Sequence, residues 1–141
     1  ETVALLDALL LGVADDSSAA KREVCAEGMA EFLKWAAKHA GAGRSSQTVS
    51  NPESLLRRIF ERLCHPEPYQ RLGGATALCH CYKQLYQPEL REVTSKLLLE
   101  ALFYTLSALR VADGDPEGVE TVGLLRRTAL RLGALASRRA S

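Results

Sequence analysis

Five side chains in the middle of the chain could bind a metal ion. They are Cys64, His65, Cys79, His80 and Cys81. Structural zinc sites usually take ligands from C-x2-C pairs, which this stretch lacks. On a helix, Cys79 and Cys81 would lie about 200° apart around the axis, so that their thiols would face away from each other. We therefore expect these residues to be core or boundary residues and expect no metal site.

The remaining reactive side chains give no catalytic pattern. No carboxylate or nucleophile stands at a suggestive spacing from His39 or His80, which predicts solvated or boundary histidines. Trp35 is expected to be partly buried against the loop that follows its helix. The kinase signatures, a glycine-rich loop, His-Arg-Asp and Asp-Phe-Gly, are not found. We predict no catalytic residue, no cofactor and no small-molecule substrate in this segment.

The last stretch of the chain, residues 121–141, is basic. It has no acidic residue and five arginines: Arg126, Arg127, Arg131, Arg138 and Arg139. One reading is weak contact of Arg126, Arg127 and Arg131 with nucleic acid phosphates, and the other is a solvated helix face. The stretch contains no aromatic residue, Asn or Gln, so any such contact would lack base stacking and base readout.

Composition points to one globular core. The chain has 141 residues, of which 47% are hydrophobic and 25% charged, and a net charge of +1. This charge implies no global attraction to nucleic acid or membrane. No run approaches the roughly 20 apolar residues of a membrane span. The four cysteines favour free thiols in a reducing compartment. Because no initiator Met is present, we expect an excerpt from a longer protein.

Apolar periodicity predicts helices throughout, with no competing β-alternation. Asn51-Pro52-Glu53 is typical of a helix start, and 65–68 (HPEP) predicts a tight corner. Residues 41–50 are small and polar, which indicates a flexible loop. The expected helices cover about residues 1–14, 18–40, 52–64, 68–86, 89–112 and 117–137.

The periodicity also predicts which side chains lie in the core. Leu63, Leu78 and Leu97 each stand in the middle of an apolar stripe. Val24 and Val119 are likewise assigned to the apolar sides of their helices.

Two segments of the chain resemble each other, KREVCAEGMAEFLK (21–34) and QRLGGATALCHCYK (70–83). Their alignment matches Arg22 with Arg71, Ala26 with Ala75, Met29 with Leu78, and Lys34 with Lys83. In HEAT-type repeats, an arginine near the start of the second helix ties down the turn before it. We therefore predict an all-α fold, an α-solenoid of HEAT-like antiparallel helix pairs with about six helices. The pairs would span about 1–40, 52–86 and 89–137.

Gly73 and Gly74 fall at the start of the second of these segments. Each costs about 1 kcal/mol relative to Ala inside a helix. Close packing against a neighbouring helix would justify them, and the alternative is that the helix begins after them.

Two longer stretches carry a family resemblance. KREVCAEGMAEFLKW (21–35) and ESLLRRIFERLCHPEPYQRLGGATALCHCYKQL (53–85) resemble the helical-repeat region of the DNA-dependent members of the phosphatidylinositol-3-kinase-related kinase family. The resemblance covers about residues 15–112 and lies in the early part of the circular cradle, far from the kinase domain. It implies a non-catalytic scaffold segment of a nuclear serine/threonine kinase that the Ku heterodimer recruits to broken DNA ends in non-homologous end joining. By the same resemblance, the partners are the rest of the solenoid, Ku and DNA ends, with no membrane.

Two alternative functions stay open at this point. One is a HEAT or armadillo interaction scaffold of an unrelated pathway, such as transport or phosphatase assembly. The other is a small helical DNA-binding domain that uses the arginine-rich last helix. Kinase motifs far downstream on the same polypeptide would favour the kinase scaffold.

Overall fold

The computed structural model describes residues 2–39, 51–115 and 118–140. Within them it contains helices and turns and no strand, so the all-α prediction with about six helices is confirmed. The expected flexible loop at 41–50 lies outside the described residues. The α-helices are α1 (Thr2–Val13), α2 (Ala19–His39), α3 (Pro52–Leu63), α4 (Pro68–Cys81), α5 (Arg91–Ala112) and α6 (Gly118–Ala140), and two 3-10 helices, η1 (Tyr82–Tyr86) and η2 (Pro88–Leu90), join α4 to α5.

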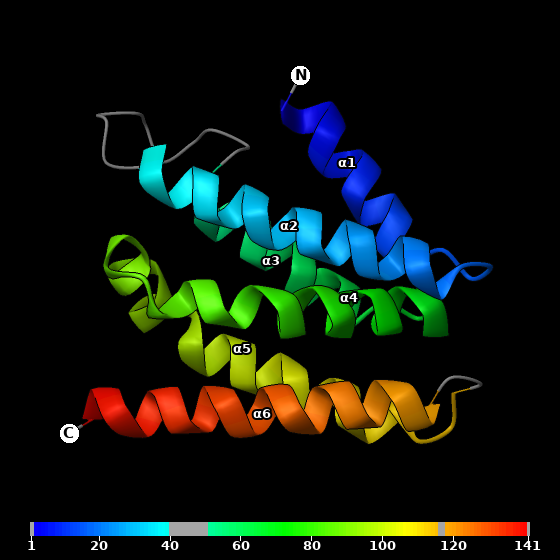
Figure 1. The fold of residues 1–141 in the computed structure, drawn as a ribbon. Coiled ribbons are helices and arrows are strands. Elements are labelled where there is room, and N and C mark those ends of the chain that lie inside the picture. Colours follow the sequence, from blue (N-terminus) through cyan, green and yellow to red (C-terminus); the bar gives the residue numbers. More distant parts are fainter. Residues whose placement is uncertain (1, 40–50, 116–117, 141) are drawn as a thin grey trace.

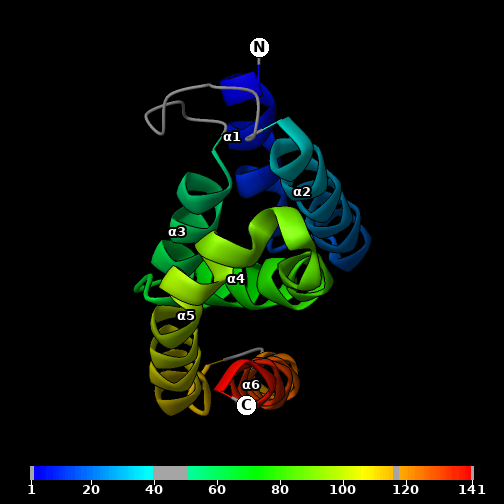
Figure 2. The same cartoon turned by 90° about the vertical axis from the view of Figure 1, so that its left-hand side faces the viewer.

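The helices form two layers. In Figure 1, α2, α4 and α6 run in the same direction, one below the other, and α4 contacts both of its neighbours. Figure 2 shows α3 and α5 on the other side, where they contact each other and pack on α4. Consecutive helices pack as α1 with α2, α3 with α4, and α5 with α6. No helix in the described part of the chain is both long and apolar enough for a membrane span.

The helix starts follow from local sequence. The Asn51 side chain accepts a hydrogen bond from the Glu53 backbone N–H at 2.8 Å, and Pro52 occupies the first turn of α3. At α2, the Ser18 hydroxyl accepts a hydrogen bond from the Lys21 N–H at 3.2 Å. These caps satisfy N–H groups that have no partner inside the helix, so both predicted starts are confirmed.

The core runs through all six helices. Leu63, Leu78 and Leu97 are fully buried, as predicted. The assignment of Val24 and Val119 is wrong, because their side chains are 66% and 94% exposed. The inward stripes of α2 and α6 lie on the opposite side from these valines: Arg22, Ala26, Met29 and Leu33 in α2, and Thr121, Leu125, Thr128 and Leu132 in α6.

Buried threonines explain the error in α6. The Thr128 hydroxyl donates to the Leu124 carbonyl at 2.8 Å, and in α5 the Thr105 hydroxyl donates to the Ala101 carbonyl at 2.6 Å. A hydroxyl satisfied within its own helix can enter the core. Hydropathy therefore assigned Val119 to the buried side of α6 and missed Thr121 and Thr128, whereas Leu125 and Leu132 are buried as their periodicity indicates.

The helix predicted over 68–86 changes form after Cys81. The chain continues as η1 and η2, which bury Leu85 and Leu90. The Thr94 hydroxyl of α5 donates to the Leu85 carbonyl at 3.2 Å and fixes this connection. Tighter 3-10 turns therefore carry the chain from α4 to α5.

The Gly73–Gly74 pair lies inside α4, so the alternative of a later helix start is wrong. A Cβ on Gly73 would lie 2.6 Å from the Val13 carbonyl oxygen, and one on Gly74 would lie 2.9 Å from the Leu63 nitrogen. Both glycines therefore allow the close packing that the sequence predicted.

Candidate functional site

The arginine at the start of α2 holds the turn between α1 and α2. Arg22 is buried, and its guanidinium donates to the Asp15 carbonyl oxygen at 2.8 Å. The same guanidinium lies over the Tyr69 ring of α4, 5.6 Å from its centroid. Arg22 thus ties its own turn to the next helix pair.

The matching arginine of α4 makes more bonds. Arg71 donates to the carbonyl oxygens of His65 at 2.7 Å and Pro66 at 2.8 Å, both in the turn before α4. Its Nε also donates to an Asp115 carboxylate oxygen at 3.0 Å, and a second, shorter bond completes a two-point contact. Both side chains are more than nine-tenths buried. The predicted arginine-to-turn contact is confirmed, and the Asp115 partner extends it to the third helix pair.

The turn between α1 and α2 also contains a charged cluster. The Asp15 carboxylate accepts hydrogen bonds from Lys21 Nζ at 2.7 Å and from the Ser17 backbone at 2.8 Å. The Lys21 ammonium above all, and then Ser17, hold the pKa of Asp15 well below its usual range. This turn is therefore held by the ion pair of Lys21 with Asp15 as well as by the hydrogen bond from Arg22.

The four cysteines are free thiols in different surroundings. Cys81 is fully buried, and burial raises the pKa of its thiol to about 12. Cys64 is exposed at the end of α3, whereas Cys79 and Cys25 are half-buried. Across the described residues, no three His, Cys, Asp or Glu side chains are grouped so that they could hold a metal ion.

The structure gives one predicted boundary histidine a carboxylate partner. His80 of α4 lies 2.6 Å from a carboxylate oxygen of Glu23 in α2. The two residues are 57 positions apart, so spacing along the chain could not reveal the pair. His39 stacks on Trp35 with ring centroids 4.6 Å apart, and Trp35 is 39% exposed. The loop expected to cover Trp35 lies outside the described residues.

The basic last helix uses its arginines in two ways. Arg126 and Arg127 are exposed. Arg131, in contrast, lies 4.4 Å from the centroid of the Tyr82 ring and within 3.8 Å of the Cys79 sulfur. Of the three arginines predicted as possible phosphate contacts, Arg126 and Arg127 are therefore accessible, whereas Arg131 packs on η1 and α4.

The other two arginines of α6 lie near its end. Arg138 stands 5.9 Å from the Tyr86 ring centroid. Arg139 donates to the Arg91 carbonyl at 2.9 Å and to the Ser95 hydroxyl at 2.6 Å. These contacts join α6 to η1 and α5, and they were invisible in the sequence because their partners lie more than 40 residues away.

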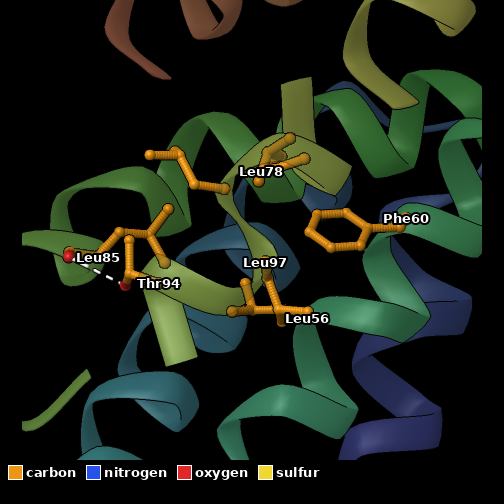
Figure 3. A pocket seen from close by; sticks show the side chains of 8 residues that line it. Leu56, Phe60, Leu78, Leu85, Thr94 and Leu97 are labelled. Carbon is orange, nitrogen blue, oxygen red and sulfur yellow. Dashed lines mark hydrogen bonds between the residues drawn. The ribbon is translucent and has the colours of Figure 1, made fainter. Parts of the chain in front are cut away.

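An apolar cavity lies between α3, α4 and α5 (Figure 3). Leu56, Phe60, Leu78 and Leu97 contribute to its wall, and its volume is about 10 Å³. That volume is near the lower limit for a single water molecule. Moreover, no buried side-chain polar atom in the described part of the chain lacks a hydrogen-bond partner. The cavity is therefore a packing defect rather than a ligand site.

The contacts of Arg22, Arg71 and Arg139 join helices within and between the three pairs. The family model for the DNA-dependent protein kinase catalytic subunit, CC1/2, matches residues 1–128. The chain belongs to this family. The matched segment is helical and non-catalytic, and it serves as a scaffold segment of that kinase.

Individual relatives agree with the family match. The chain is 33% identical over 122 residues to the DNA-dependent protein kinase catalytic subunit of mouse (Mus musculus) and 30% identical over 122 residues to that of dog (Canis lupus familiaris). The chicken protein (Gallus gallus) is 29% identical over 121 residues. Each alignment covers 86% of this chain and 3% of the relative. The chain therefore spans about 3% of the length of the curated relatives that it matches.

Proposed function

We propose that this chain is an architectural segment of a DNA-dependent protein kinase that acts in the nucleus, in double-strand break repair by non-homologous end joining. The family match over residues 1–128 carries this proposal. The bonds of Arg22 and Arg71 support it, because each reaches from one helix pair to the next. Bonds of this kind hold each helix pair in a defined orientation relative to the next pair of the scaffold.

The proposed architecture is a HEAT-like solenoid of three helix pairs, at about 1–40, 52–86 and 89–137. Its support is the register of Arg22 and Arg71, which occupy the same position in α2 and α4 and hold the preceding turn. By resemblance, the proposed partners are the rest of the solenoid, the Ku heterodimer and DNA ends.

The test places Arg71→Ala in the full-length kinase. We expect weaker assembly on Ku-bound DNA ends and less end joining in cells that lack the endogenous kinase, because the second and third helix pairs lose their buried bond. Arg110→Ala is the matched control, since it removes an exposed arginine of the same scaffold that is not among the proposed phosphate contacts. An architectural role would be contradicted if the Arg71→Ala protein joined ends normally although its helical segment was shown to be destabilised.

A second candidate function is weak, sequence-independent DNA contact through Arg126, Arg127 and Arg131. The exposure of Arg126 and Arg127 favours it. Each phosphate contact contributes about 0.9 to the log–log slope of affinity against salt. Replacing all three arginines with Ala should reduce that slope by at most roughly 3. Because Arg131 packs on Tyr82, the Arg126 and Arg127 changes alone should produce most of the reduction.

The control for this measurement is Arg110→Ala on α5, which removes an exposed arginine outside α6. Duplex affinity that is insensitive to salt, or that depends on base sequence, would rule out contact by charge alone. No binding at low salt would identify the basic side of α6 as a solvated face.

A further inference from the structure

One side of α5 is both apolar and exposed. Leu99, Phe103 and Leu106 follow one another at spacings of four and three residues, which places them on a single stripe of the helix. Their side chains are 76%, 64% and 56% exposed. Single apolar side chains are ordinary on a protein surface, whereas a contiguous group of large ones marks a contact surface. The stripe is therefore a candidate surface for another helix.

This stripe lies on the side of α5 that points away from α3. The Tyr104 ring stacks on the Phe60 ring of α3, with centroids 5.6 Å apart. Leu106 follows Tyr104 by two residues, which is a rotation of about 200° around the helix axis. Figure 2 shows α3 above α5 and no described helix on the opposite side of α5. Within the described part of the chain, α5 is thus the outermost helix of its layer.

The neighbouring helix α6 also has exposed apolar side chains. Val119 and Leu130 are among the most exposed large apolar residues, and they lie about three turns apart on one side of the helix. Thr121 and Thr128, each two residues away from one of them, are buried on the other side. In Figure 1, α6 forms the edge of its layer, next to α4. Both helices of the last pair therefore present apolar side chains at the same end of the stack.

An apolar outer face is unsuited to the end of a helical-repeat stack. Each repeat contacts only its neighbours, and a terminal repeat needs a polar outer face to remain in solution. The α5–α6 pair has large apolar side chains at that position, so it has the surface of an internal repeat. The chain spans about 3% of the length of the curated relatives that it matches. A kinase of that length has enough additional chain to supply the missing neighbour.

We propose that α5 and α6 form the docking face for the helix pair that follows α6 in the full-length kinase. The first helix of that pair packs along Leu99, Phe103 and Leu106, as α5 itself packs on α3. The second helix covers α6 at Val119 and Leu130. This inference rests on the proposed architectural function, and it names the surface through which the segment joins the rest of the scaffold.

The docking face also bears on the second candidate function. Arg126 lies on the same side of α6 as Val119 and Leu130, because it is seven residues from the first and four from the second. A helix that covers the two apolar side chains covers Arg126 as well. Docking and DNA contact therefore compete for Arg126 in the full-length kinase.

Photo-crosslinking in the full-length kinase tests the docking face and identifies its occupant. Phe103 is replaced by p-benzoylphenylalanine, which keeps an aromatic ring there, and Glu61, exposed on α3, is replaced in the same way as the matched control. We expect the Phe103 replacement to crosslink within about 90 residues after Ser141 of the same polypeptide, the length of two repeats. Crosslinks to a second copy, to another protein or to a distant part of the polypeptide would overturn the inference. So would a yield no higher than that of the Glu61 control.

Thiol labelling of the full-length kinase gives an independent measurement without a bulky side chain, and it decides the question if the Phe103 replacement fails to fold. Leu106→Cys should react with N-ethylmaleimide at least about tenfold more slowly than Glu61→Cys, because the docked helix must open before the thiol is reached. Mass spectrometry of the labelled peptides measures both rates, and equal rates would refute the docking face. Failure of the architectural function is distinguishable, since it appears as normal end joining by Arg71→Ala and leaves these rates unchanged.

Discussion

The first and second helix pairs meet through a close fit, whereas the second and third meet through buried charge. At the first contact, Gly73 brings α4 against the backbone of Val13. At the second, Arg71 binds the carboxylate of Asp115. Both residues belong to the first turns of α4, so one stretch of helix serves two neighbours by different physical means. Added side-chain volume at the first contact should therefore lower the stability of the fold, and so should removal of a charge at the second contact.

The largest expected effect concerns the charged contact. Arg71→Ala would leave the Asp115 carboxylate buried without its guanidinium and would free the carbonyls of His65 and Pro66. Removing one partner of a buried ion pair costs about 3–5 kcal/mol of unfolding free energy. Urea denaturation measures this loss. Replacing both charges, as in Arg71→Met with Asp115→Leu, should restore much of it, and a double variant no more stable than Arg71→Ala would contradict the account.

The contact by close fit should respond next. In Gly73→Ala, the added Cβ meets the Val13 carbonyl oxygen at 2.6 Å, so the backbones must move apart. We expect a loss of about 1–3 kcal/mol in unfolding free energy. Gly123→Ala in α6 is the matched control, since its Cβ would meet nothing within 4 Å. It should be stabilising by up to about 1 kcal/mol, because Ala favours helix. Equal effects of the two changes on the unfolding free energy would show that helix propensity, and not the contact with the Val13 backbone, determines the outcome.

Arg22→Ala should have a smaller effect than Arg71→Ala, although both arginines are buried. Arg22 loses one hydrogen bond to the Asp15 carbonyl and one contact with the Tyr69 ring, and no carboxylate is left without its partner. About 1–2 kcal/mol of unfolding free energy is expected. Denaturation of the two variants under the same conditions measures the difference. If Arg22→Ala proves as costly as Arg71→Ala, the comparison between the two contacts fails.

The smallest effect concerns pH. The pKa of Asp15 is lowered in the folded chain, chiefly by Lys21, and that of Glu53 is lowered chiefly by Lys96. A carboxyl whose folded pKa is below its unfolded value of about 4 stabilises the fold above that value. This contribution is lost as the pH falls through 4 toward the lowered folded pKa. Denaturation at pH 6 and pH 3 should show a drop in stability that is smaller in Asp15→Asn than in the wild type.

Sequence reasoning predicted features that depend on neighbouring residues. The Asn51 cap, the buried Leu78 and the close approach at Gly73 follow from hydrogen-bonding capacity, periodicity and the lack of a side chain. The internal repeat went further, because it assigned Arg22 and Arg71 to the turns before their helices. Both predictions of an arginine-to-turn bond are confirmed.

The partners of charged side chains were not predictable in this way. Glu23 meets His80, and Arg131 meets Tyr82, only after α2, α4 and α6 have packed side by side. The wrong assignment of Val119 has a related cause, since Thr121 and Thr128 took the buried positions of α6. Hydropathy does not mark a threonine whose hydroxyl is satisfied within its own helix.

By itself, the sequence determined the helices, their approximate ends, the repeated arginine and the family resemblance, because each depends on residues close together in the chain or on their linear pattern. Only the tertiary structure decided that Asp115 completes the bonds of Arg71, that Arg131 packs inward while Arg126 and Arg127 stay exposed, and that Thr121 and Thr128 rather than Val119 are buried in α6. The physical reason is that the rotation of a helix about its axis depends on what the neighbouring helices present to it. Periodicity restricts that rotation, and the packing of all six helices selects it.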